Sequence, residues 1–168
     1  MEFRDLTKDD IEVRIQSVHA GGVVLLLYKN ARVDMNILDE TVGAENWQDK
    51  FYENKGILFC SIGINTNYKE ADKPDRWVWK GDAGTESNTE AEKGNASDAR
   101  KRSGFVWGIG RELYTSPFIW IKAEDCKIKD GKCKDVFAVE KIVIEKKKIR
   151  ALSIVNNTQR KRVFVWQG

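Results

Sequence analysis

The chain has 168 residues, of which 41% are hydrophobic and six are tryptophan, and its net charge is +3. This length and this apolar content are typical of one folded domain with its own core, and they exclude a disordered chain. We therefore predict a single domain spanning residues 1–168.

Charge is distributed unevenly along the chain. Residues 122–168 carry 13 Lys and Arg against 6 Asp and Glu, whereas the first 121 residues carry 16 against 20. This asymmetry predicts an acidic partner for the C-terminal part, and DNA, RNA and an anionic protein all satisfy it.

The first half of the chain predicts one strand, one helix and then three antiparallel strands. The apolar run 23–28 is typical of a buried strand, and residues 33–42 have the apolar spacing of a helix that ends at Gly43. The following strands are expected at roughly 46–54, 57–66 and 75–82. Alternation places Leu58, Cys60, Ile62 and Ile64 on one face of the second strand, and it places Trp77 and Trp79 on one side of the third.

The segment 95–114 predicts a helix, reached through a polar loop at 81–94. One face carries mostly small residues at spacings of three and four, which predicts close seating on the rest of the fold: Ala96, Ala99, Ser103, Val106, Gly110 and Leu113. At about 100° per residue, Arg100 and Arg102 flank this stripe and Lys101 points away from it. Such cations suit a polyanion, although a charge run is also typical of a solvated helix face.

The remainder predicts strands. Pro117 ends the helical region, and a strand is expected at 118–121. Alternating segments at 137–144, 149–155 and 162–166 predict a C-terminal meander. The fold class is therefore α+β, with an antiparallel β-β-β-α core at 20–121 and a basic β-meander extension at 122–168.

Cysteine and histidine usage predicts neither a metal site nor a secreted protein. Cys60 lies in an apolar run, which favours a core position. Cys126 and Cys133 flank an Asp130-Gly131 turn, where they either oppose each other in a hairpin or remain free thiols. The odd cysteine count, with no leader and no long apolar segment, favours the cytoplasm and no membrane partner. His19 is the only histidine, so a metal centre is not expected.

Enzymatic motifs are missing from the sequence. There is no glycine-rich phosphate loop, and Gly108-Ile-Gly110 lacks the third glycine of a dinucleotide fingerprint. We expect no cofactor and no catalytic residue. A metal-dependent nuclease stays open as an alternative that uses scattered carboxylates: Asp34, Asp39, Glu40, Asp82 and Glu86.

Five collinear segments carry a resemblance to a known family. They are Tyr28-Lys-Asn-Ala-Arg32-Val, a short helix, Gly43-Ala-Glu-Asn-Trp47, Lys80-Gly-Asp-Ala-Gly84-Thr-Glu86-Ser87, and Ala96-Ser-Asp98-Ala-Arg-Lys101-Arg102 with Trp107-Gly108. In this order they resemble the Rad-fifty-two/twenty-two superfamily of single-strand annealing proteins, in particular its short phage members of the Sak type. The resemblance covers about residues 20–121.

This resemblance implies a groove between sheet and helix, oligomeric rings or helices, and annealing of single-stranded DNA without ATP. The family's inner-groove basic positions fall on Arg32, Lys101 and Arg102. A further family arginine falls on Phe105 here, and an aromatic that follows the family's glycine falls on Ala44.

Further residues are candidates for DNA contact on their own chemistry. Arg76, Lys80, Arg100 and Arg111 are cations near the same loops and helix. Trp77, Trp79 and Tyr28 offer stacking surfaces, or the tryptophans cover the sheet or a subunit interface. The C-terminal cations form either an outer DNA path or a solvated hairpin: Lys146, Lys147, Lys148, Arg160, Lys161 and Arg162.

The function predicted from these features is single-stranded DNA binding and annealing in phage recombination and DNA repair, within the bacterial host cytoplasm. The predicted partners are single-stranded DNA and further copies of the chain, with an exonuclease or a single-strand binding protein as a possible companion. The alternative is a protein that coats single strands or recruits a recombination factor without annealing.

Overall fold

The computed structural model describes residues 1–85 and 91–168, with side chains described from residue 94 in the second range. It forms two compact units, each built from two separate stretches of chain. Unit 1 consists of Met1–Arg4 and Asn30–Ile109, and unit 2 consists of Asp5–Lys29 and Gly110–Gly168. The predicted annealing core at 20–121 therefore draws on both units.

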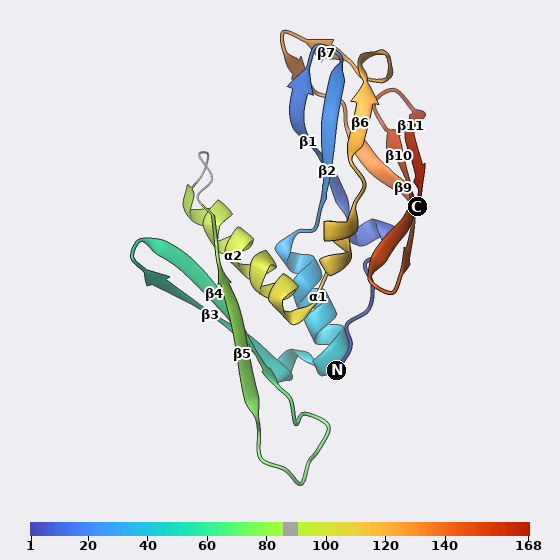
Figure 1. Cartoon of the computed structure of the whole chain (residues 1–168). Helices are drawn as coiled ribbons and strands as arrows, with labels where there is room; N and C mark the ends of the chain where they lie inside the picture. Colours follow the sequence, from blue (N-terminus) through green and yellow to red (C-terminus); the bar gives the residue numbers. More distant parts are fainter. Residues whose placement is uncertain (86–90) are drawn as a thin grey trace. The chain divides into compact units, whose positions relative to one another are not determined.

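Unit 1 contains one antiparallel sheet and two helices (Figure 1). Its sheet has the order β3-β4-β5, formed by β3 (Trp47–Asn54), β4 (Ile57–Asn65) and β5 (Trp77–Ala83). The helices are α1 (Ala31–Val42) and α2 (Ala91–Trp107). Both strand pairs keep an unbroken register, so side chains alternate strictly between the two faces of the sheet.

One face of this sheet is covered by α2, which contacts β4 and β5. Cys60, Ile62 and Ile64 of β4 point to this face and are completely buried. Burial of the Cys60 thiol raises its pKa to about 11, so it remains protonated in the core. The predicted apolar face of this strand is confirmed.

The first helix begins where its sequence predicts a cap. Asn30 precedes it, and the Asn30 side chain accepts hydrogen bonds from the backbone N–H groups of Arg32 and Val33. Val33, Ile37, Leu38 and Val42 are buried, as the helical spacing predicted. Gly43 follows with a φ of 89°, which confirms the predicted end of the helix.

The second helix is shorter at its C-terminal end than predicted. It ends at Trp107, because Gly108 and Gly110 adopt φ angles of 105° and 74°, and Arg111–Thr115 continue as a separate 3-10 helix. The predicted helix at 95–114 was therefore wrong beyond Trp107, and Gly110 and Leu113 do not belong to its buried stripe. Ala99 and Ser103 are fully buried, as predicted. The loop expected at 81–94 was wrong at both ends, since β5 extends to Ala83 and α2 begins at Ala91. Residues 86–90 of that loop lie outside the described residues.

Unit 2 contains the remaining strands (Figure 1). One sheet has the order β1-β2-β6, and a second has the order β11-β10-β9. A two-stranded hairpin, β7-β8, connects them along the chain. The bounds are β1 Glu12–His19, β2 Gly22–Tyr28, β6 Ile119–Lys122, β7 Ile128–Lys129, β8 Lys132–Cys133, β9 Phe137–Glu145, β10 Lys148–Asn156 and β11 Lys161–Gln167.

The predicted α+β class and the C-terminal strand meander are confirmed, since β9, β10 and β11 form consecutive antiparallel pairs. Strand β1 was not predicted. The β7-β8 hairpin pairs Ile128 with Cys133 rather than Cys126 with Cys133, and all three cysteines are free thiols. No helix among the described residues is long and apolar enough to cross a membrane.

Gly104 provides a direct test of how closely the two helices of unit 1 approach. A Cβ atom at Gly104 would lie 2.7 Å from Oδ1 of Asp34, which is itself fully buried on α1. We expect Gly104→Ala to lower the free energy of unfolding by about 1 kcal/mol, measured by urea denaturation.

The matched control is Gly94→Ala, at an exposed position of the same helix. This change is expected to raise stability by up to about 1 kcal/mol through helix propensity alone. If both substitutions stabilised the protein equally, the close approach of α1 and α2 would be contradicted.

Candidate nucleic-acid interface

The α2 helix is fixed to the sheet by two polar side chains one turn apart. The Ser103 hydroxyl donates to the carbonyl oxygen of Cys60 at 2.5 Å and accepts from the N–H of Asp82 at 3.2 Å. The Trp107 indole N–H donates to the carbonyl oxygen of Ile62 at 2.9 Å. These bonds fix both the position and the rotation of α2 about its axis.

This rotation determines the direction of each cation on α2. With Ser103 facing the sheet, about 100° per residue places Arg102 on one flank, Gly104 on the other, and Lys101 on the side away from the sheet. The contact of Gly104 with Asp34 agrees, because it puts α1 on the Gly104 flank. The observed seating of Ser103 thus gives the same arrangement by helical geometry as the sequence did, and the direction of Lys101 stays a prediction.

Arg100 joins α2 to β3. Its Nε and Nη2 atoms lie 2.6 and 2.5 Å from Oδ2 of Asp49, and its guanidinium lies 5.2 Å from the centre of the Phe51 ring. About a quarter of the Arg100 side chain is exposed. This ion pair gives Arg100 a structural role, whereas its predicted role in DNA binding stays a prediction.

Arg102 is oriented by Asp98, one turn earlier on α2. Its Nε lies 2.9 Å from Oδ2 of Asp98, and the same oxygen accepts from the N–H and the hydroxyl of Thr85. Burial alone would raise the pKa of Asp98, but the hydrogen bonds from Thr85 and Arg102 outweigh it and lower that pKa. Asp98 thus holds Arg102 in place.

The other predicted cations lie in different settings. Lys80 lies on the helix-facing side of β5, with its ammonium group 4.5 Å from the centre of a Trp107 ring. Arg32 is exposed on the first turn of α1, and Arg76 is exposed just before β5. Arg111 is exposed in the 3-10 helix of unit 2. Six of the seven predicted DNA-binding residues therefore belong to unit 1, and Arg111 does not.

Four of the five carboxylates considered for a nuclease lie among the described residues, and each is buried or forms a structural contact; Oδ1 of Asp82 accepts from the backbone N–H of Ala83 at 2.8 Å. Asp34 is buried, Asp39 accepts from the Trp47 indole, and Glu40 pairs with Arg4. Glu86 lies outside the described residues. No group of three or more potential metal ligands occurs in the described part of the chain. These contacts do not support the nuclease alternative.

Several C-terminal cations form ion pairs within unit 2. Lys147 pairs with Asp5, Lys161 with Asp125 at 2.7 Å, and Arg162 with Glu140 at 2.6 Å. The Arg162 guanidinium and the Ser153 hydroxyl hold the pKa of Glu140 at about 2. These pairs weaken the case for an outer DNA path along the meander.

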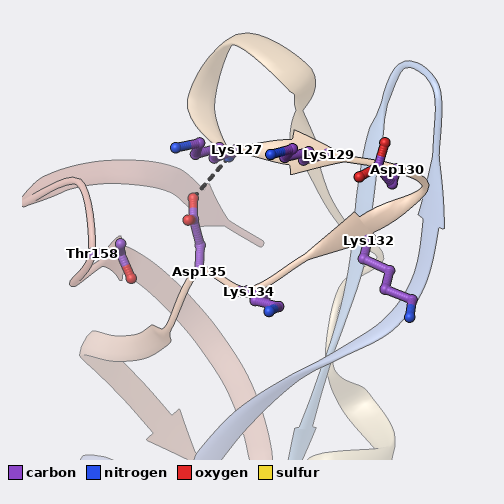
Figure 2. Close-up of a pocket in the computed structure, with 7 residues that line it drawn as sticks. All are labelled: Lys127, Lys129, Asp130, Lys132, Lys134, Asp135 and Thr158. Atoms are coloured by element: carbon purple, nitrogen blue, oxygen red, sulfur yellow. Dashed lines mark hydrogen bonds between the residues drawn. The ribbon is translucent and has the colours of Figure 1, made fainter.

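Sequence reasoning missed a different group of cations, the lysine hairpin, which consists of Lys127, Lys129, Lys132 and Lys134. They surround a cavity of about 560 Å³ at β7-β8, together with Asp130, Asp135 and Thr158 (Figure 2). Lys129 lies directly opposite Lys132 in the hairpin, an arrangement that costs stability unless an anion is near. The alternation of lysines around Asp130-Gly131 was the signal for it.

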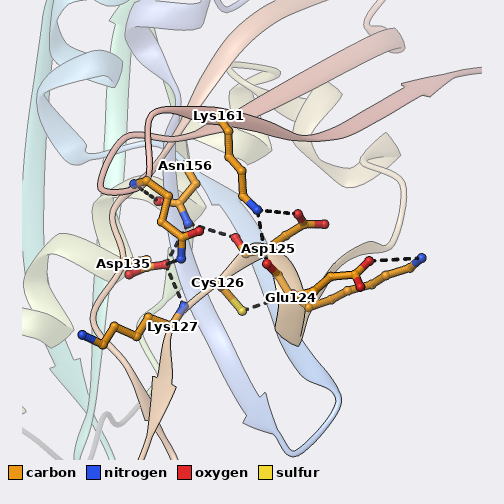
Figure 3. A network of polar contacts seen from close by, with 9 residues as sticks. Glu124, Asp125, Cys126, Lys127, Asp135, Asn156 and Lys161 are labelled. Atoms are coloured by element: carbon orange, nitrogen blue, oxygen red, sulfur yellow. Dashed lines mark hydrogen bonds and ion pairs between the residues drawn. The ribbon is translucent and has the colours of Figure 1, made fainter.

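Asp135 does not neutralise this group by an ion pair. It is buried, and its Oδ2 accepts from the Lys127 backbone N–H and from the side-chain amides of Asn156 and Gln159 (Figure 3). Burial acts to raise the pKa of Asp135, and these hydrogen bonds lower it overall. The Asp135 carboxylate thus links the hairpin, through Lys127, to β10, through Asn156.

Comparison with known proteins gave no match: the chain fits no family model and resembles neither a curated protein nor a solved structure.

The lowered pKa of Asp98 predicts a pH-dependent contribution to stability. Its ionised form stabilises the folded state above the unfolded pKa of about 4, and this contribution is lost as pH falls through the lower native pKa. We expect Asp98→Asn to be destabilising at pH 7, and the difference from the unsubstituted protein to shrink below about pH 4. Urea denaturation across this pH range measures the free energy of unfolding of both proteins.

Asp72→Asn serves as the control, because Asp72 is exposed in the connection between β4 and β5. This variant should unfold like the unsubstituted protein at each pH. A constant deficit of Asp98→Asn from pH 7 to pH 2 would contradict the assigned role of the ionised carboxylate.

Proposed function

We propose that this protein binds single-stranded DNA and anneals complementary strands during homologous recombination, without ATP and as an oligomeric ring or helix. The observation that carries the proposal is the seating of α2. Ser103 and Trp107 fix the helix on the sheet, and Asp98 orients Arg102, so Lys101 and Arg102 are held at defined angles. The collinear motif resemblance assigns these same two residues, with Arg32, to a DNA groove.

Annealing requires the backbone to be held while the bases stay available for pairing. Lys and Arg provide sequence-independent phosphate contacts, which position a strand without reading its bases. Cations on a fixed helix lose little conformational freedom on binding, so each contact retains more of its free energy. Lys80, next to Trp107 at the C-terminal end of α2, extends the cationic surface along β5.

Annealing also involves a second strand, and unit 2 offers a surface suited to it. The lysine hairpin carries four ammonium groups that form no ion pair within the described residues. An approaching phosphate backbone would relieve the repulsion between Lys129 and Lys132. We assign the hairpin to contact with the second strand.

Charge reversal on α2 tests the proposal. We expect Lys101→Glu combined with Arg102→Glu to reduce the rate of annealing of complementary oligonucleotides at least tenfold, because phosphate attraction becomes repulsion. Annealing is followed by fluorescence energy transfer between labelled strands, and thermal denaturation checks the fold.

The matched control is Lys55→Glu combined with Lys73→Glu, which changes net charge equally at exposed positions of unit 1 outside the candidate set. This control should anneal normally. Normal annealing by the α2 variant would show the groove assignment to be wrong. If the unsubstituted protein bound single-stranded DNA but slowed the pairing of complementary oligonucleotides, the alternative of a coating protein would be favoured.

Salt dependence gives an independent measurement. Each phosphate neutralised on a single strand contributes about −0.7 to the slope of log K against log salt. We expect a steep slope for dT20, reduced in the Lys101/Arg102 variant by about 1 to 2. A flat response of the unsubstituted protein would contradict binding through phosphates.

A further inference from the structure

The face of the unit 1 sheet that points away from α2 has a composition of its own. Strict alternation gives this open face the residues Gln48, Lys50, Tyr52 and Asn54 of β3, Ile57, Phe59, Ser61, Gly63 and Asn65 of β4, and Trp77, Trp79, Gly81 and Ala83 of β5. Both helices in the described part of unit 1 attach to the opposite face, through Ser103, Trp107 and the bond from Trp47 to Asp39.

Four aromatic side chains on the open face form two pairs. Tyr52 and Phe59 stack with their ring centres 5.2 Å apart and 8° between their planes. Trp77 and Trp79 lie 6.4 Å apart at 29°. The Trp79 ring lies over Gly63, where a Cβ atom would come within 2.7 Å of it. The absence of a side chain at Gly63 therefore allows the indole to lie against the backbone of β4.

The charge on the sheet is divided between its faces. The strands carry three carboxylates, Asp49, Glu53 and Asp82, and all three belong to the helix-facing side by register. Among the residues of these three strands, Lys50 is the only charged one on the open face, and its ammonium group lies 4.2 Å from the centre of a Trp79 ring. At the end of this face, Asn65 donates to Oδ1 of Asp75 in the β4–β5 connection at 2.8 Å. An aromatic surface whose strands contribute one cation and no carboxylate is electrostatically complementary to a nucleic acid strand.

We propose that Lys50, Tyr52, Phe59, Trp77 and Trp79 form an aromatic platform on which bases of single-stranded DNA stack, with Lys50 contacting an adjacent phosphate. This inference rests on the proposed function, since it gives single-stranded DNA a base-stacking surface on the face of the sheet opposite to α2. Stacking uses the flat face of a base, and every base has such a face, so the platform is sequence-independent. Half of Tyr52 is exposed, which makes it the most open ring of the platform.

The neighbouring side chains favour bases over a second protein copy. Gln48, Asn54 and Ser61 are polar and uncharged, and they can form hydrogen bonds with base edges. A base that stacks through its flat face keeps its Watson–Crick edge exposed. A stacked base can therefore still pair with a complementary strand, as annealing requires.

The experiment compares binding of dT20 with binding of a 20-mer of abasic sites, which has the same phosphates but no bases. We expect the unsubstituted protein to bind dT20 at least about tenfold more tightly than the abasic strand. Trp79→Ala and Tyr52→Ala should each reduce this ratio severalfold. Because Trp79 lies against β4, Tyr52→Ala keeps the test valid if Trp79→Ala fails to fold.

The matched control is Phe118→Ala, which removes an exposed aromatic ring from unit 2 and should leave the ratio unchanged. Equal affinity of the unsubstituted protein for both strands would overturn the platform and leave the proposed function standing. A normal base preference without faster annealing would overturn the proposed function and leave the platform standing. Variants that dissociate into smaller oligomers with an unchanged ratio would show that this face joins copies of the chain.

Discussion

The attachment of α2 to β4 is the constraint on which the candidate site depends. Two side-chain hydrogen bonds, from Ser103 and Trp107, reach backbone carbonyls of one strand. Ala99 and Gly104 have no bulk to hold the helix away from its neighbours. A helix seated in this way cannot rotate without breaking these bonds, and the directions of Arg100, Lys101 and Arg102 follow from its seating.

The three consecutive cations therefore have three different environments. Arg100 joins α2 to β3 through Asp49, and Arg102 is oriented by Asp98. Helical geometry directs Lys101 away from the sheet. The same register that directs these residues also separates the carboxylates of the sheet from its aromatic open face. The two faces of unit 1 thus differ in chemistry: the helix-covered side carries the α2 cations, and the open side carries aromatic rings and no carboxylate within its strands.

Sequence periodicity correctly predicted the helices and strands in which the apolar or small residues that recur in the sequence are also the buried ones. The alternation of Cys60, Ile62 and Ile64 and the small residues of α2 located the sheet and the helix that covers it. The end of α2 was missed because helical spacing continues through Gly110 and Leu113, while Gly108 and Gly110 adopt backbone angles that stop the helix. Arg100 pairs with Asp49, which lies 51 residues away in the chain, and Arg102 pairs with Asp98, which lies one helical turn away. The spacing of residues in the sequence does not identify either partner.

The most direct measurement of the central claim is lysine acetylation followed by mass spectrometry, with and without a single-stranded oligonucleotide. If α2 and the neighbouring end of β5 grip the strand, Lys101 and Lys80 will be acetylated severalfold more slowly in the complex, while Lys55 in the turn between β3 and β4 will react at the same rate. Unchanged reactivity of Lys101 and Lys80 under conditions where the oligonucleotide is bound would contradict the account.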